Sequence, residues 1–319
     1  MSGSIEMSSR ASDVRLEHRA ARQAASNLAR RQLTQNAAFA LAWLSAFLAV
    51  AASVWIIGYV VVQGAQAIDL EFLTTRPAGG ISGEGGMSTT IVTTLYLVAL
   101  IIIIATPLGV GAAIYLTEYA GEVQRESRLM YYLVTAARTG VEILAGVPSI
   151  IFGLFGFTLF VVTLKFGFSL LSAGLSGACM ILPVIIRTSE EALLAVPRSY
   201  REGSLALGAT KWQTTVGVVL PAALPGIITG IVLSVGRIIA ETAIFWVTLG
   251  GSYRLPTSIN HAGRSMALHV YMLASETRAF DKAMGTAAVL IVTIIVLNLM
   301  INVTSRRLTA RLKGRGGAF

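Results

Sequence analysis

Two charged residues lie inside a long apolar segment near residue 240. Arg237 and Glu241 stand in the sequence Ser-Val-Gly-Arg-Ile-Ile-Ala-Glu-Thr, within an apolar span predicted over residues 222–249. Their spacing of four residues predicts that both side chains stack on one helix face, one turn apart. A charge at the centre of a bilayer costs at least about 2.5 kcal/mol on insertion scales, so it needs a partner or a water-filled path.

The side chain of Arg237 suits an oxyanion, because its planar fork of donors stays charged and matches phosphate geometry. One interpretation is therefore an anion pathway in which Glu241 supplies the counter-charge. The other is a buried intrahelical ion pair without substrate contact. At the end of an earlier apolar span, Arg187 and Glu190 are open to two similar interpretations, an inner gate of the pathway or a simple interface anchor.

The polar segment 187–221 separates two apolar spans and forms a second candidate site. Within it, residues 202–208 predict a short helix with Leu205 on a different face from Glu202. Gly208 stands where a helix C-cap belongs, because glycine adopts the left-handed conformation without steric cost. After a two-residue turn, a second helix is predicted to run from Lys211 into the membrane. Such a helix–turn–helix is a docking element rather than a spanning one.

The composition is that of a polytopic membrane protein. Of 319 residues, 55% are hydrophobic and 13% are charged, and the mean hydropathy is +0.72, whereas a soluble chain carries about 25% charged residues. The net charge of +9 is not accompanied by a nucleic-acid motif, so we expect a lipid bilayer and no nucleic acid as the partner. The single cysteine and three scattered histidines exclude a disulfide and a metal cluster, and no cofactor is expected.

The chain order predicts an all-α fold with six transmembrane helices. A basic cytoplasmic tail is expected over residues 1–36, a permease domain over 37–305 and a second basic tail over 306–319. The six spans, each close to the length that a bilayer requires, are predicted at 37–62, 89–116, 149–164, 168–186, 222–249 and 284–303. Residues 129–147 read as an amphipathic lead-in that breaks at Gly146-Val147-Pro148.

Charge counting predicts the topology. With both termini inside, the cytoplasmic segments hold eighteen Lys and Arg residues and the external segments hold six. This asymmetry is typical of a membrane protein whose termini are both cytoplasmic. The sequence lacks the Gly-x-x-x-x-Gly-Lys-Ser/Thr loop, so this chain is not expected to bind nucleoside triphosphate in that manner. It also lacks a nucleophile elbow, and no enzyme activity is expected.

The polar segment resembles the coupling loop of ABC-importer permeases. In that loop Glu-Ala-Ala, three residues, Gly, nine residues, Ile, one residue and Leu-Pro follow one another. Here Glu202-Gly203-Ser204 stands for Glu-Ala-Ala, Gly208 for Gly and Val218 for Ile, and Leu220-Pro221 closes the motif. Gly203 in place of alanine should weaken the short helix by about 1 kcal/mol, so docking is expected to supply part of its order.

Further segments resemble the phosphate-specific ABC transporter permeases of the PstA type, over roughly residues 37–310. In particular, the Arg-Ile-x-x-Glu-Thr sequence that begins at Arg237 distinguishes phosphate permeases from most other importers that have this loop. The other matching segments are Pro107–Gly109, Ile114–Tyr119, Gly146–Phe155, Leu182–Glu190, Val196–Pro197 and Ala206–Trp212.

The resemblance implies a type I ABC importer permease fold in a bacterial plasma (inner) membrane. It implies a second homologous permease, two ATP-binding subunits on separate chains and an extracytoplasmic phosphate-binding protein as partners, and phosphate as the substrate. ATPase coupling is then expected to use Glu202, Gly203, Ser204, Leu205, Gly208, Leu220 and Pro221. Two alternatives stay open: a permease for another oxyanion (phosphonate, sulfate or molybdate), and a membrane scaffold that senses phosphate.

Overall fold

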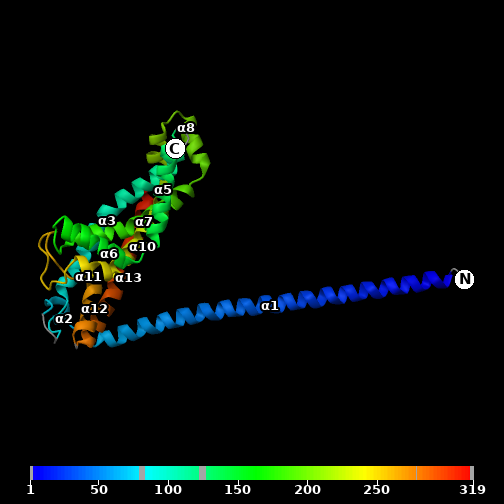
Figure 1. Ribbon diagram of the computed structural model, residues 1–319, viewed down its shortest axis with the longest axis horizontal. Helices are drawn as coiled ribbons and strands as arrows, with labels where there is room; N and C mark the ends of the chain where they lie inside the picture. The colour runs from blue at the N-terminus through cyan, green and yellow to red at the C-terminus, as the bar shows by residue number, and fades with distance from the viewer. Residues whose placement is uncertain (1–2, 79–82, 122–126, 278, 317–319) are drawn as a thin grey trace. The chain divides into compact units, whose positions relative to one another are not determined.

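The computed structural model describes residues 3–78, 83–121, 127–277 and 279–316. The chain divides into two compact units, residues 1–59 and 60–319. The first unit is the larger part of α1 (Gly3–Ala65), which runs without a break through the predicted tail and the first apolar span (Figure 1). Within α1, residues Thr34–Ala65 have the length and hydropathy of a membrane-crossing helix. The first span is thereby confirmed.

The second unit is helical throughout its described residues apart from turns, loops and two isolated β-bridges. After α1 the elements are α2 (Leu70–Thr74), α3 (Ser88–Ile114), η1 (Tyr115–Tyr119), α5 (Arg128–Ala145), α6 (Ser149–Gly156), η2 (Phe157–Thr163), α7 (Leu170–Leu194), α8 (Arg198–Ala206), α9 (Lys211–Thr214), η3 (Thr215–Val219), α10 (Leu220–Ala240), α11 (Ala243–Thr248), α12 (Met266–Glu276) and α13 (Phe280–Gly316). The elements η1, η2 and η3 are single π-helical turns that continue an α-helix.

Five helical segments of the described chain are long and apolar enough to cross a membrane, and a bent pair brings the number to six. The pair consists of residues 128–145 and 149–163, which meet at an angle of 109°. The predicted break at Gly146-Val147-Pro148 is confirmed. Proline causes it because the pyrrolidine ring disfavours a helical conformation of the residue before it, and Pro148 itself has an extended backbone as the N-cap of α6.

Helix α7 lies at the centre of the second unit, where it packs against α3, α10, α6 and α5. The main core combines Ile101 of α3, Ile181 and Ile185 of α7 and Phe245 of α11, all of them fully buried. Gly109 permits the close approach of α3 and α7, since a Cβ there would lie 2.7 Å from Ile185 Cγ2. By contrast, a Cβ at Gly111 would meet no atom within 4 Å in this chain.

The fifth span differs from the prediction of one helix over residues 222–249. The helix begins earlier, at Lys211, and continues through η3 and α10 to Ala240. There it ends, since Glu241 has an extended backbone with φ −72° and ψ 129°. The shorter helix α11 follows from Ala243. Apolar periodicity cannot detect this break, because the residues on both sides of it are equally apolar.

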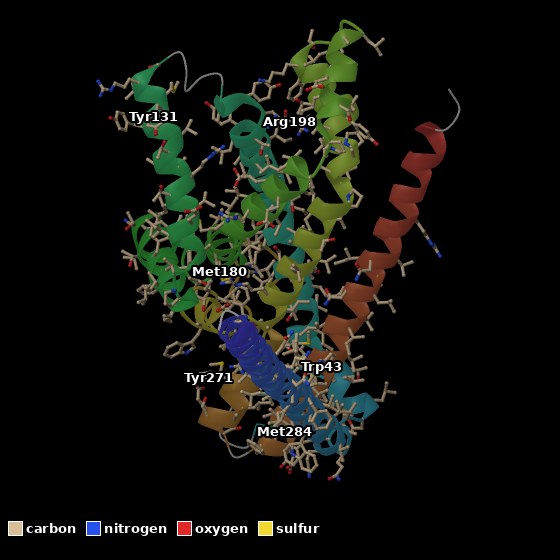
Figure 2. The ribbon with its side chains drawn as sticks, turned by 90° about the vertical axis from the view of Figure 1, so that its right-hand side faces the viewer. Trp43, Tyr131, Met180, Arg198, Tyr271 and Met284 are labelled. Carbon is tan, nitrogen blue, oxygen red and sulfur yellow. The ribbon has the colours of Figure 1, made fainter. Side chains whose placement is uncertain are left out.

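The two ends of the second unit carry different elements. Helix α8 lies at one end, and α2 and α12 lie at the other (Figure 1). Tyr131 and Arg198 mark the first end in Figure 2, and Tyr271 and Met284 mark the opposite one. Helix α13 rises from the end that carries Met284 towards the end that carries α8 (Figure 2). The C-terminal part of the chain is therefore on the same side as α8.

Candidate coupling helix and anion pathway

The predicted short helix of the polar segment exists and starts four residues earlier than expected, at Arg198. It ends at Ala206, and Gly208 adopts a φ of +85°. This left-handed conformation confirms the predicted role of Gly208, because residues with a Cβ rarely adopt it. A Cβ at Gly203 would meet no atom within 4 Å, so packing within this chain does not require glycine there.

A capping box starts the second helix of the polar segment. The Thr210 hydroxyl accepts a hydrogen bond from Gln213 N at 3.3 Å, and Gln213 Oε1 accepts one from Thr210 N at 2.8 Å. Each side chain satisfies a backbone donor that the first turn of a helix leaves free. The helix continues to Leu220 and Pro221, which are half-buried at the start of α10. These hydrogen bonds thus fix the end of the turn that connects α8 to α9.

The surface of α8 and its turn is open and partly apolar. No residue of α8 is buried. Leu207 is 91% exposed, and Leu205, Trp212 and the charged Glu202 are also exposed. Exposed apolar side chains beside a charged one are typical of a surface that binds another protein. Ser204 is half-buried, and its hydroxyl shares a hydrogen bond of 2.9 Å with the Thr214 hydroxyl.

One ion pair that the sequence analysis missed joins α8 to the rest of the unit. Arg201 Nη2 lies 2.6 Å from Glu118 Oε1, and the side chains are 20% and 9% exposed. The same guanidinium donates to the carbonyl oxygens of Val196 and Leu193 at 2.8 and 2.9 Å. The sequence signal for Glu118 is its position, since it is a charged residue at the end of an apolar span. Its partner lies 83 residues away, and sequence spacing does not reveal the pairing.

Arg237 and Glu241 do not stack on one helix face, so that prediction was wrong. Helix α10 ends between them, at Ala240, and the extended backbone of Glu241 turns the chain away from the helix axis. Arg237 is exposed on the surface of this chain and Glu241 is half-buried. Neither belongs to the ion pairs found among the described residues.

Arg187 and Glu190 lie three residues apart in α7, but the ion pairs of Arg187 are made with two other carboxylates. Arg187 Nη1 lies 3.0 Å from Glu142 Oε1 of α5, and Arg187 Nε lies 3.4 Å from Glu191 Oε1. Positions three and four residues away are both neighbours on a helix, and here the i,i+4 partner, Glu191, pairs with Arg187. Arg187 and Glu190 line a cavity of about 300 Å³ together with Arg138 and Glu142. It lies between α5, α7 and the end of α3.

A buried cationic cluster occupies the opposite end of the unit. Arg264 is 4% exposed, and its Nε donates to the Gly251 carbonyl at 3.0 Å. Its guanidinium lies 4.1 Å above the Tyr253 ring, and Nη1 lies 3.3 Å from His269 Nδ1. Because arginine only donates, His269 Nδ1 must accept and the imidazole is neutral.

The pKa of His269 agrees with that geometry. Burial lowers it to about 3, and the positive charges of Arg264 and Lys282 add to the effect. The segment between the fifth and sixth predicted spans therefore contains an ordered centre that the sequence analysis did not foresee. In the sequence, this centre appears as one arginine near one histidine, and that pattern is too weak to recognise in a single sequence. No group of three or more potential metal ligands occurs in the described part of the chain.

Comparison with known proteins identifies the family of this chain. The chain is 34% identical over 276 residues to the phosphate transport system permease protein PstA 1 of Mycobacterium tuberculosis H37Rv, covering 85% of this chain and 87% of the relative. It is 30% identical over 285 residues to the probable ABC transporter permease protein YqgI of Bacillus subtilis, covering 84% and 94%.

Two solved structures share the fold. A bacterial importer of the polysaccharide alginate superposes with a TM-score of 0.51 at 17% identity, covering 69% of this chain and 79% of the other. The inward-facing methionine transporter MetNI superposes with a TM-score of 0.50 at 23% identity, covering 70% and 93%. Residues 109–314 match the family described as binding-protein-dependent transport system inner membrane component. This chain is a member of that family, the multi-pass membrane permeases of ABC transporters.

Proposed function

We propose that this chain is the permease subunit of an ATP-driven importer of inorganic phosphate. The observation that carries the proposal is the similarity along most of the chain to permeases named for phosphate transport, at 34% identity and 85% coverage. The Arg-Ile-x-x-Glu-Thr sequence at Arg237 belongs to the same resemblance. The fold by itself does not identify the substrate, because transporters of alginate and of methionine share it.

The proposed assembly contains a second homologous permease, two ATP-binding subunits and an external phosphate-binding protein. The exposed surface of α8, with Glu202, Leu205 and Leu207, supports docking to an ATP-binding subunit. Gly203, Ser204, Gly208 and the start of α10 at Leu220-Pro221 would hold this surface in position. No ATP-binding motif was found in the chain itself, so hydrolysis would take place on the docked subunit.

The proposed orientation places α8 and both termini in the cytoplasm, in a bacterial plasma membrane. The excess of Lys and Arg in the segments on that side supports it. Since α13 runs towards the end that carries α8 (Figure 2), the C-terminal part and the coupling helix share one side of the bilayer. In this arrangement 1–36 and 306–319 are cytoplasmic tails of the permease domain 37–305.

The proposed anion path passes Arg237 and the helix break beside it. Non-helical backbone at membrane depth is tolerated where it is buried in protein or lines a water-filled cavity. The break at Glu241, together with an arginine exposed on the surface of this chain, therefore supports a path between this chain and a second permease. At the cytoplasmic mouth, Arg187 and Glu190 would line the path through their shared cavity.

The proposed mechanism is alternating access. ATP binding closes the ATPase pair, α8 transmits that movement, and the two permeases open outward to accept phosphate. Hydrolysis returns them to the inward-open state. Arg237 binds the anion transiently because a permanent charge in a partly desolvated path attracts phosphate without requiring a proton.

Labelled-phosphate uptake at low concentration, in cells with and without this chain, tests the proposal. We expect loss of an ATP-dependent flux that sulfate, molybdate and phosphonate do not compete with. Arg237→Gln is expected to abolish uptake while the transporter still assembles, and wild-type uptake by the folded variant would remove Arg237 from the path. Loss of a different anion's uptake would retain the permease and change the substrate. An unchanged flux together with altered phosphate-responsive gene expression would favour the sensing scaffold.

A further inference from the structure

We propose that the Arg201–Glu118 ion pair is the mechanical link that carries the movement of α8 into the membrane helices. The inference rests on the proposed docking of α8 to an ATP-binding subunit. It assigns Arg201 and Glu118 as positioning residues, since neither is proposed to contact the anion or ATP. Their function would be to connect the docked helix to the end of α3.

The geometry of the pair is that of a rigid fork. Nε of Arg201 donates to both carboxylate oxygens of Glu118, at 3.1 and 3.3 Å, and Nη2 donates to Oε1 at 2.6 Å. A bidentate arginine–carboxylate contact restricts orientation as well as distance. Glu118 therefore follows Arg201 when the guanidinium moves.

The same guanidinium also ties α8 to the end of α7. Its Nη1 donates to the carbonyl of Val196, and its Nη2 donates to the carbonyl of Leu193 in the last turn of α7. These oxygens lie at a helix C-terminus, where carbonyl groups lack partners within the helix and the dipole favours a cation. One side chain thus joins the coupling helix to the ends of the two membrane helices that pack most closely together, α3 and α7.

Few other contacts of α8 within this chain could transmit force. No residue of α8 is buried, so this helix has no fully buried apolar side chain to anchor it. The hydrogen bond from Ser204 to Thr214 connects α8 to the helix that follows it in the chain. Among the described contacts of α8, the fork at Glu118 is therefore the direct connection to α3.

Glu118 occupies a conformation suited to such a role. It lies in the π-helical turn η1, Tyr115–Tyr119, at the end of α3. A π-turn holds one more residue than an α-helical turn and often marks functional sites. Nearby, Lys211 Nζ lies 5.0 Å from the centre of the Tyr119 ring, so the first residue of α9 touches the same turn. Movement of the coupling segment thus reaches one short, irregular part of α3.

The experiment compares transport with ATP hydrolysis in the whole transporter, purified and reconstituted in vesicles. Glu118→Gln retains the side-chain shape without the charge, and Arg201→Lys retains the charge without the fork. Matched controls are Glu276→Gln and Arg128→Lys, at exposed positions outside the coupling segment. The measured quantities are ATPase co-purification, ATP hydrolysis stimulated by the loaded binding protein, and labelled phosphate imported per ATP hydrolysed.

We expect both variants to retain the ATPase while phosphate imported per ATP falls at least fivefold, with both controls unchanged. An unchanged ratio in either folded variant would overturn the proposal. Loss of fold or of ATPase co-purification in both variants would also overturn it, because the pair would then serve assembly rather than transmission.

Leu207→Asp separates this inference from the docking on which it rests. If α8 docks as proposed, a charge at this exposed apolar position should remove the ATPase from the purified transporter. Retention of the ATPase by Leu207→Asp would contradict the docking itself. Loss of the ATPase there, with an unchanged ratio in Glu118→Gln, would contradict the link alone.

Discussion

Two arginines, Arg201 and Arg187, make ion pairs of opposite character. Arg201 and Glu118 are 20% and 9% exposed, whereas Arg187 and Glu142 are 54% and 64% exposed. Arg201 also donates to two backbone carbonyls. Arg187 instead divides its contacts between Glu142 and Glu191, at 3.0 and 3.4 Å. One arginine is enclosed and the other faces a cavity.

The difference shows how one residue type serves two purposes. An enclosed fork is screened little by solvent and fixes the relative position of the segments that it joins. An exposed pair is weak and salt-sensitive, so its partners exchange readily. An arginine whose carboxylate partners are easily replaced can accept a passing anion, while an enclosed one is better suited to hold a structure. This contrast leads to three predictions.

The largest effect is expected when the enclosed pair loses one member. Arg201→Met should lower the free energy of unfolding by about 3–5 kcal/mol, because it leaves Glu118 as a buried charge without its partner. Thermal unfolding of the purified chain in detergent measures the change. The double variant Arg201→Met/Glu118→Leu should recover most of the loss. A single variant as stable as the wild type would show that Glu118 is hydrated, and the contrast between the two arginines would disappear.

An intermediate effect is expected from acidification, which protonates His269 beside the second enclosed arginine, Arg264. Because the folded pKa of His269 is about 3 and the unfolded value is about 6.5, the unfolded chain binds the extra proton first as the pH falls. Stability is therefore full above pH 6.5 and is lost progressively between pH 6.5 and 3. At pH 5 the loss from this group is about 2 kcal/mol. His269→Gln should lack this share of the acid sensitivity when melting is compared at pH 7.5 and 5. An identical pH dependence in the variant would contradict a neutral, buried His269.

The smallest effect is expected at the exposed pair. Glu142→Gln should leave the thermal unfolding midpoint unchanged within error, because solvent screens this contact and Arg187 retains Glu191 as a partner. Melting in low and high salt, with Glu118→Gln as the matched variant of the enclosed pair, tests the difference. A clear loss of stability in Glu142→Gln would mean that the cavity closes around this pair in the folded protein.

Much of the fold could be predicted from local sequence. The span over residues 37–62 and the break before Pro148 depend on hydropathy and on proline geometry, which act over a few residues. Gly208 could be assigned a left-handed conformation because a helix end requires one. The short helix α8 followed from the same local signals, although with Pro197 as its N-cap it starts four residues earlier than expected.

The candidate site was harder to predict where it depends on a change of direction or on distant partners. Helical periodicity predicted that Arg237 and Glu241 would stack, but the helix ends between them. Arg187 was considered with Glu190 as an inner gate or an interface anchor, whereas the structure pairs Arg187 with Glu142 of α5, 45 residues away. The roles of these residues in transport stay predictions.

The amino-acid sequence by itself determined the all-helical class, the number of spans and the position of the short helix α8, because hydropathy, capping and turn chemistry are local properties. Only the tertiary structure decided which charges meet. It brought Glu118 to Arg201 and Glu142 to Arg187, and it buried Arg264 against His269. The physical reason is that an ion pair depends on distance and desolvation, and both are set by how helices distant in the sequence pack together.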